Sequence, residues 1–467
     1  MTDFWGELLR AVGDIIGAHG PAAATAQSYT PTDYSIHFFL QVAVILLVCR
    51  IVGWVAKKYL GQPQVVGEMI AGVLLGPSLL GLFFPDLQAA LFPKETRNIL
   101  YVCAQLGVGL YMFLVGTTLR LDHFQSKAKS AAGVSAAGII APFLLAVLIT
   151  PFLLDIPGLF TAGLSQSSAT LFMGACIALT AFPMLARIIN ERGLADTSLG
   201  TLTLTAGAFD DAVSWCVLAI VLATFGGGPG IALLALVGGL GFALFMIFAG
   251  RPLLAPLGRM VEAKGEMTST MFSIILMLFA LSAFAMDAAG IHAVFGGFLL
   301  GVCMPRGKLT EEIKRKVEPI TILLVPIFFT YSGLNTRLDT VNSLELLALA
   351  LAILAVSIAA KFGACWLAAR LAGEDNRTAL GIGALMNARG LMELIIINIG
   401  LQKGIIGPTL FSIMVLMAIV TTVMAGPLFE VVYGRKARAA GELGALGTEG
   451  AANSPAGVES ALARRPS

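Results

Sequence analysis

The chain has 467 residues, of which 57% are hydrophobic and only 12% are charged, with 52 glycines and a mean hydropathy of +0.87. This composition excludes a water-soluble domain and indicates an all-α polytopic membrane protein. The formal net charge of +2 argues against a nucleic-acid partner.

Residues 1–35 come before the first apolar stretch and include the amphipathic piece FWGELLRAVGDIIGAHG. This piece lies either along the outer membrane interface or free in solvent as a helix. A bilayer core of about 30 Å needs roughly 20 apolar helical residues per crossing, so the remaining sequence predicts thirteen spans. They cover residues 36–56, 64–82, 98–118, 131–154, 168–190, 197–225, 231–250, 268–287, 290–304, 318–334, 343–370, 378–402 and 408–433.

Basic residues gather in alternate connections between these spans. One set of connections includes the cluster Arg306, Lys308, Lys314, Arg315 and Lys316, whereas the other set holds only Arg10, Lys94, Arg97, Arg337 and Lys403. By the positive-inside rule, this bias predicts a multi-pass protein of the cell membrane with its N-terminus outside and its C-terminus in the cytoplasm. The tail at 435–467, which is rich in Ala, Gly, Glu and Ser, is expected to be disordered.

Two pairs of segments resemble each other in the same order in both halves of the chain. AGVLLG at 71–76 matches GGFLLG at 296–301, and LYMFLVGTTLRLD at 110–122 matches IFFTYSGLNTRLD at 327–339. Because spans 2 and 9 run in opposite directions in the predicted topology, the halves 36–225 and 268–434 are inverted repeats joined by a connecting helix at 231–250. Inverted repeats are typical of secondary transporters with a site near the midplane.

Corresponding helices of such repeats are often broken at that site. In span 5, Pro183 removes a backbone donor and clashes with the preceding turn. Thr180, just before Ala181, lies where the freed carbonyls need partners. The sequence therefore predicts an interruption here, with a simple proline kink as the alternative.

Span 12, the equivalent of span 5, is interrupted at Asn387-Ala388-Arg389-Gly390. Glu393 follows Arg389 by four residues on the same helix face, so the two side chains can pair. Glu68, near the inner end of span 2, either lines a funnel or caps its helix. The interruption in span 12 thus supports a pair of broken helices at the midplane.

Asp210 and Asp211 stand side by side in GAFDDAVSW, about thirteen residues into span 6. A charge at the bilayer centre costs about 3 kcal/mol even on lenient scales, and successive helix positions face about 100° apart. Lys361 sits at comparable depth in span 11. One Asp is therefore expected to pair with Lys361 while the other faces a water-filled funnel; two acids neutralised only to hold helices together are the alternative.

A carboxylate that titrates near cytoplasmic pH holds either a proton or a bare monovalent cation, so the two compete for one site. Competition at an alternating-access site is antiport, which needs neither covalent chemistry nor a cofactor. Thr180, Asn387 and backbone carbonyls would supply further oxygens for a hard cation. The six cysteines form no CxxC pair, and no phosphate-binding GxGxxG or P-loop follows a strand, so neither a metal cluster nor a nucleotide-binding domain is expected.

The motifs ALTAFPMLARIINERGL, AFDDAVSW, Lys361 and MNARGLMELIIINIG, in that order, resemble the monovalent cation/proton antiporter superfamily. The branch they are most similar to holds bacterial potassium-efflux-type antiporters and plant cation/proton exchangers. The resemblance covers residues 36–434. It implies a homodimer in which a core of spans 4–6 and 11–13 slides against a dimer domain of spans 1–3 and 8–10. It also implies that Asp211 is the ion and proton carrier, that Asp210 pairs with Lys361, and that spans 5 and 12 cross as broken helices.

Two departures from the family pattern bear on specificity. Potassium-efflux relatives usually have Gln and plant exchangers Asn at the position of Asp210, whereas paired acids resemble electrogenic sodium/proton antiporters. A nucleotide-binding domain like that of the ligand-gated potassium members is also not expected. The leading expectation is exchange of protons for Na⁺ or K⁺, or both, and the alternatives are a passive cation channel and a non-transporting membrane sensor.

Overall fold

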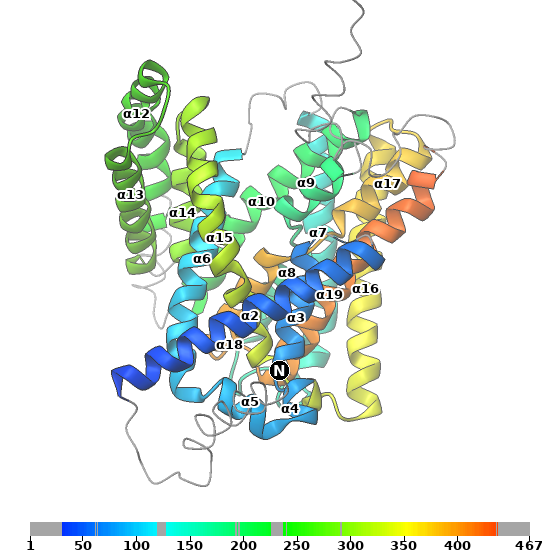
Figure 1. Cartoon of the computed structure of the whole chain (residues 1–467). Helices are drawn as coiled ribbons and strands as arrows, with labels where there is room; N and C mark the ends of the chain where they lie inside the picture. The colour runs from blue at the N-terminus through cyan, green and yellow to red at the C-terminus, as the bar shows by residue number, and fades with distance from the viewer. Residues whose placement is uncertain are drawn as a thin grey trace, which may run out of the picture.

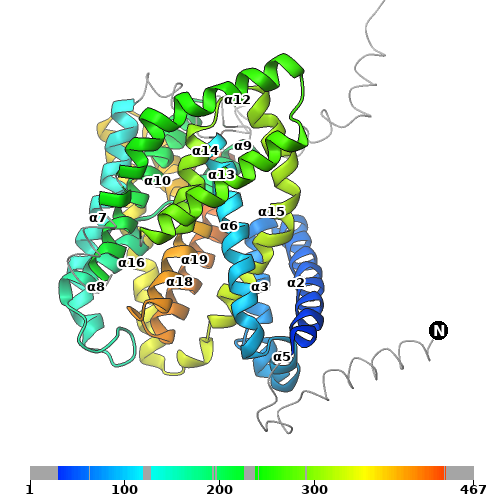
Figure 2. The same ribbon diagram turned by 90° about the vertical axis from the view of Figure 1, so that its left-hand side faces the viewer.

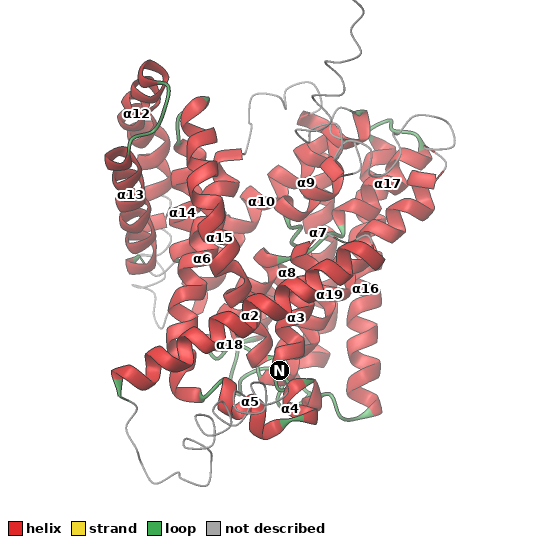
Figure 3. Ribbon diagram, viewed as in Figure 1, coloured by secondary structure: helices red, strands yellow, loops and turns green. Residues whose placement is uncertain are grey.

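The computed structural model describes residues 30–60, 62, 64–118, 128–191, 194, 197–225, 237–239, 241–289, 292–435 and 437. In this part of the chain the regular structure is entirely helical, apart from one isolated bridge between Phe160 and Ile406 (Figure 3). Most of the predicted N-terminal segment, the start of the connecting helix at 231–236 and the tail beyond residue 437 lie outside the described residues.

Nine helical stretches among the described residues are long and apolar enough to cross a membrane. They are Pro31–Leu60, Gln64–Phe83, Pro85–Thr117, Lys129–Leu154, Val237–Lys264, Ser269–Ala288, Lys308–Thr340, Leu344–Leu371 and Pro408–Gly434. The shorter apolar helices Ala293–Cys303 and Glu393–Gln402 accompany them. The chain is therefore an all-helical, multi-pass membrane protein, as its composition predicts.

Several helices run beyond their predicted ends. Helix α2 covers Pro31–Leu60 instead of 36–56, and α15 covers Lys308–Asn335 instead of 318–334. The connecting helix continues through the π-helical turn η4 (Met246–Gly250) into α12 (Arg251–Lys264). The sequence had predicted a connection between two spans at residues 251–264. Apolar runs mark only the part of a helix inside hydrocarbon; charged residues continue it into the interface, where their long side chains reach water.

The helices form two bundles; in Figure 1 most of the first lies on the left and most of the second on the right, and α2 crosses in front of the second. The first bundle contains α2, α3 (Gln64–Leu75), α6 (Arg97–Thr118), η4, α12, α13 (Ser269–Ala288), α14 (Ala293–Cys303) and α15. The short elements α4 (Leu80–Phe83), α5 (Pro85–Leu91) and η2 (Lys94–Thr96) connect α3 to α6. In the side view of Figure 2, α12 and α13 lie on the near face of this bundle.

The second bundle contains α7 (Ala128–Leu154), α8 (Gln166–Ala178), α9 (Phe182–Glu191), α10 (Ser198–Phe225), α16 (Leu344–Leu371), α17 (Asn376–Met386), α18 (Leu391–Gln402), α19 (Pro408–Phe429) and the π-helical turn η6 (Glu430–Gly434). Helix α7 packs against α8, α10 and α16, and α16 packs against α17. The bundles meet where α19 contacts α3 and the short helix η5 (Leu338–Thr340). The predicted division into spans 1–3 with 8–10 and spans 4–6 with 11–13 follows these two packing groups.

The repeated glycine motifs pack reciprocally inside the first bundle. A Cβ at Gly333 of α15 would lie 1.9 Å from the Gly72 carbonyl oxygen of α3, and one at Gly116 of α6 would lie 2.3 Å from the Phe298 carbonyl oxygen of α14. Each motif of one half therefore packs on the other motif of the opposite half. Glycine is needed here because the backbones touch, which is how small residues let membrane helices approach.

Candidate functional site

The two interrupted helices of the second bundle meet at their interruptions. Helix α8 ends at Ala178 and α9 begins at Phe182, while α17 ends at Met386 and α18 begins at Leu391. Thr180 Oγ1 donates a hydrogen bond to the Met386 carbonyl at 2.9 Å, and the Ala181 amide donates to the Ala388 carbonyl at 3.0 Å. Each break thus satisfies backbone groups that the other break exposes.

The break in the first of these helices lies before Pro183 and not at it. Pro183 is the second residue of α9, where a missing amide hydrogen costs nothing because the first turn of a helix has no acceptor for it. The proline therefore starts the second half-helix after the break. Its ring lies outside the described side chains.

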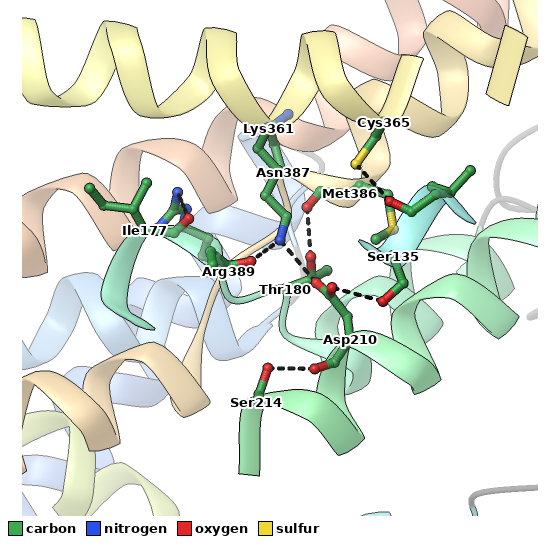
Figure 4. A network of polar contacts seen from close by, with 12 residues as sticks. Ser135, Ile177, Thr180, Asp210, Ser214, Lys361, Cys365, Met386, Asn387 and Arg389 are labelled. Carbon is green, nitrogen blue, oxygen red and sulfur yellow. Dashed lines mark hydrogen bonds and ion pairs between the residues drawn. The ribbon is translucent and has the colours of Figure 1, made fainter. Parts of the chain in front are cut away.

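Asp210 of α10 and Lys361 of α16 form a fully buried ion pair, with Lys361 Nζ 2.9 Å from Asp210 Oδ2 and both side chains at 0% exposure. Ser135 Oγ of α7 donates to Asp210 Oδ1 at 3.2 Å, so both carboxylate oxygens have partners. Lys361 also donates to the Ala178 carbonyl at the end of α8. Figure 4 shows this network. The pair ties α10 and α16 to the first break.

Arg389, in the break between α17 and α18, is also fully buried. Its guanidinium donates to the Cys176 and Ile177 carbonyls at 2.8 and 2.7 Å and to Glu393 Oε1 at 2.9 Å. With Lys361 on Ala178, two cations bind three successive carbonyls at the C-terminal end of α8, where the helix dipole is negative. The two buried acids Asp210 and Glu393 balance the charges of these cations.

Asn387 contributes a buried acceptor to the second break. It is fully buried, and its Nδ2 donates to the Gly383 carbonyl at 2.8 Å. Its Oδ1 has no hydrogen-bond partner among the residues that the structure describes. A buried acceptor in this condition costs about 1–3 kcal/mol, which a bound water or cation at the break would offset. Thr180 Oγ1 donates its hydrogen to Met386, so its lone pairs remain to bind a water or a cation as well.

Two further residues were singled out from the sequence, Asp211 and Glu68. Asp211 follows Asp210 in α10, and its side chain lies outside the described part of the structure. Glu68 lies half-buried in α3 of the first bundle and accepts a hydrogen bond from Gln64 at 3.0 Å. Among the predicted residues, the structure thus brings together Thr180, Ala181, Asp210, Lys361, Asn387, Arg389 and Glu393.

Sequence reasoning missed the two serines that hold Asp210. Besides Ser135, Ser214 donates to the Asp210 carbonyl at 2.5 Å. Ser214 lies one helical turn after Asp210, a spacing at which a serine hydroxyl often bonds its own helix. Ser135 carries no comparable signal, because serine is ordinary in a Gly/Ala-rich membrane helix and its partner is 75 residues away.

Comparison with known proteins places these features in a family. The family model described as the transmembrane sodium/hydrogen exchanger matches residues 43–433. The Na(+)/H(+) antiporter NhaS4 of Synechocystis is 38% identical over 416 residues, which are 86% of this chain and 98% of that protein. The Na(+)/H(+)-K(+) antiporter GerN of Bacillus cereus is 28% identical over 403 residues, covering 86% of this chain and 98% of GerN. The chain spans about half the length of the Arabidopsis thaliana cation/H(+) antiporters that it also matches.

The fold is similar to that of a solved structure. The sodium proton antiporter MjNhaP1 of Methanocaldococcus jannaschii superposes with a TM-score of 0.62 over 85% of this chain and 98% of that one, at 16% sequence identity. An identity this low shows a shared fold alone. The overall fold of this chain is therefore similar to that of a solved sodium proton antiporter structure.

Proposed function

This chain belongs to the sodium/hydrogen exchanger family and is a monovalent cation/proton antiporter, not an enzyme, and from this premise we propose that it exchanges protons for Na⁺ or K⁺ at Asp211 by alternating access. This assignment rests on the burial and the contacts of the neighbouring acid, Asp210. Asp210 is fully buried, and Lys361 and Ser135 occupy both its oxygens. Position 211 faces about 100° away on α10, so it is the position available for exchange.

The free acceptor at the broken helices supports the same site. Within the described part of the chain, Asn387 Oδ1 is buried without a hydrogen-bond partner, and Thr180 Oγ1 lies in the other break. Neutral oxygens of this kind replace water around a hard cation. In the proposed cycle, a proton on Asp211 and a cation bound by Asp211, Thr180 and Asn387 exclude each other. Lys361, Arg389 and Glu393 hold the half-helices in place.

The architecture around the site is part of the proposal. Thirteen crossings, with the N-terminus outside and the C-terminus in the cytoplasm, agree with the bias of basic residues described above. The second bundle would move as the core against the first, and the first bundle would join two copies in a homodimer. Reciprocal packing of the glycine motifs supports the two inverted repeats. The relatives NhaS4 and GerN are named a Na(+)/H(+) antiporter and a Na(+)/H(+)-K(+) antiporter, and on this ground we propose both Na⁺ and K⁺ as substrates.

Everted membrane vesicles test this function. An imposed pH gradient should collapse when Na⁺ or K⁺ is added, and Asp211→Asn should abolish the response. Asp339→Asn is the matched control, because Asp339 is half-exposed in a surface pair with Arg337 at 2.9 Å. Full exchange by Asp211→Asn would reject the assignment of the carrier. Cation current without obligatory proton flux would identify a passive channel, and no cation-dependent response would identify a non-transporting sensor.

A further inference from the structure

A hydrogen bond between two buried side chains crosses from one bundle to the other. Asn398 Nδ2 of α18 donates to Ser332 Oγ of α15 at 3.1 Å. Both residues are nearly inaccessible, at 4% and 2% exposure. One partner belongs to the broken helix of the second bundle and the other to a long helix of the first. The bond therefore depends on the position of one bundle relative to the other.

The hydrogen bond between Asn398 and Ser332 lies to one side of the breaks in the helices. Asn398 lies eight residues beyond Gly390, the last residue of the break, or roughly 12 Å along α18 at 1.5 Å per residue. A second cross-bundle bond lies near the same helix ends, where the Arg337 amide donates to Ser412 Oγ of α19 at 2.8 Å. In the proposed topology this is the outer side of the site, so these contacts close that side.

The bond between Asn398 and Ser332 is built to be released. Asn398 Nδ2 also donates to the Leu394 carbonyl of its own helix at 2.8 Å, so the amide keeps a partner when the bundles separate. A serine in a helix can likewise turn its hydroxyl to its own backbone. Breaking the contact therefore leaves the donor, Asn398 Nδ2, with its bond to Leu394 and releases only the acceptor, Ser332 Oγ. The ion pairs of Asp210 and Glu393 differ, because they lie wholly within the second bundle and need not break when it moves.

We propose that Asn398 and Ser332 form a catch between the two bundles that is made when the site is closed to the outside and released when it opens to that side. Both are positioning residues: they touch neither cation nor proton and set the balance between the two states. The inference rests on the proposed antiport function and adds to it the residues that bias the alternation. Since a net hydrogen bond changes an equilibrium by about 2- to 12-fold, losing the catch should populate the outward-open state by that factor.

Initial exchange rates in right-side-out and everted vesicles test the catch by giving the apparent KM for Na⁺ at each face. Ser332→Ala and Asn398→Ala should each lower the outer KM about 2- to 12-fold without lowering the inner KM. The double variant should match either single variant, because both remove the same bond. Ser332→Thr, which keeps the hydroxyl, should stay near the wild-type values.

Ser282→Ala is the matched control. Ser282 Oγ donates to the Gly296 carbonyl at 2.6 Å, which joins α13 to α14 within the first bundle. Its loss removes a buried serine hydrogen bond without touching the interface between bundles. An equal change in outer KM for Ser282→Ala, or unchanged KM at both faces in Ser332→Ala that still exchanges cations, would overturn the catch and leave the antiporter assignment intact. Absence of exchange in the wild-type protein would reject both.

Discussion

Replacing Lys361 with methionine should destabilise the protein strongly. The substitution keeps most of the side-chain volume but leaves the Asp210 carboxylate at 0% exposure without its cation. It also removes the donor on the Ala178 carbonyl. Breaking a buried pair by removing one partner typically costs about 3–5 kcal/mol, because an uncompensated charge remains inside. Ser135, at 3.2 Å, is a neutral donor and offsets only part of this cost.

Thermal unfolding of the purified protein in detergent measures the effect. The double variant Asp210→Asn/Lys361→Met removes both charges and should regain most of the lost stability, since replacing a whole buried pair is often close to neutral. Arg337→Met is the control, because it breaks a pair of the same 2.9 Å length whose side chains are 56% and 50% exposed, and exposed pairs contribute about 0–1 kcal/mol. If Lys361→Met had the same melting temperature as the control variant, the reasoning about this buried pair would be refuted.

Further changes probe the fold around the site. Gly333→Ala should destabilise the first bundle, since its Cβ would lie 1.9 Å from the Gly72 carbonyl oxygen, whereas Gly133→Ala, where nothing lies within 4 Å, should be tolerated in the same melting assay. Asp375 caps α17 by accepting from the Arg377 and Thr378 amides; Asp375→Ala should lower stability by about 1 kcal/mol and Asp375→Asn by less. Bonds from Thr378 and Arg377 lower the pKa of Asp375 below its usual value, so its stabilising contribution should persist above the unfolded pKa of about 3.9 and be lost as pH falls below it. A pH titration of the melting temperature, in which Asp375→Ala lacks this acidic limb, checks the sign.

That two helices are interrupted could be predicted because polar residues and a proline stand inside apolar spans. Thr180 and Pro183 indicated the first interruption and the run from Asn387 to Gly390 the second, although the first break lies before Pro183. The pairing of one of the two adjacent acids with Lys361 was predictable for a different reason, and the resemblance to the antiporter superfamily implied that this acid is Asp210. A buried charge needs an opposite charge at the same depth, and Lys361 met that condition.

Other features depend on tertiary packing that no local pattern specifies. The break lies before Pro183 because α9 begins just ahead of this proline, where the two interrupted helices meet. A proline in the sequence does not by itself distinguish a helix break from a helix start. Arg389 was expected to pair with Glu393, but its bonds to the α8 carbonyls arise only when the two breaks meet. Ser135 and the contact between Asn398 and Ser332 join residues far apart in the chain. Helix ends such as Lys308 extend beyond the apolar windows because charged residues continue a helix outside the hydrocarbon.

The most direct test of proton and cation competition at one carboxylate is the apparent KM for Na⁺ across a pH series in everted vesicles. Competition predicts that the KM rises as pH falls, approaching about tenfold per pH unit once the site is mostly protonated, while the maximal rate at saturating Na⁺ stays largely constant. A KM that does not change with pH would contradict a shared site for the two ions.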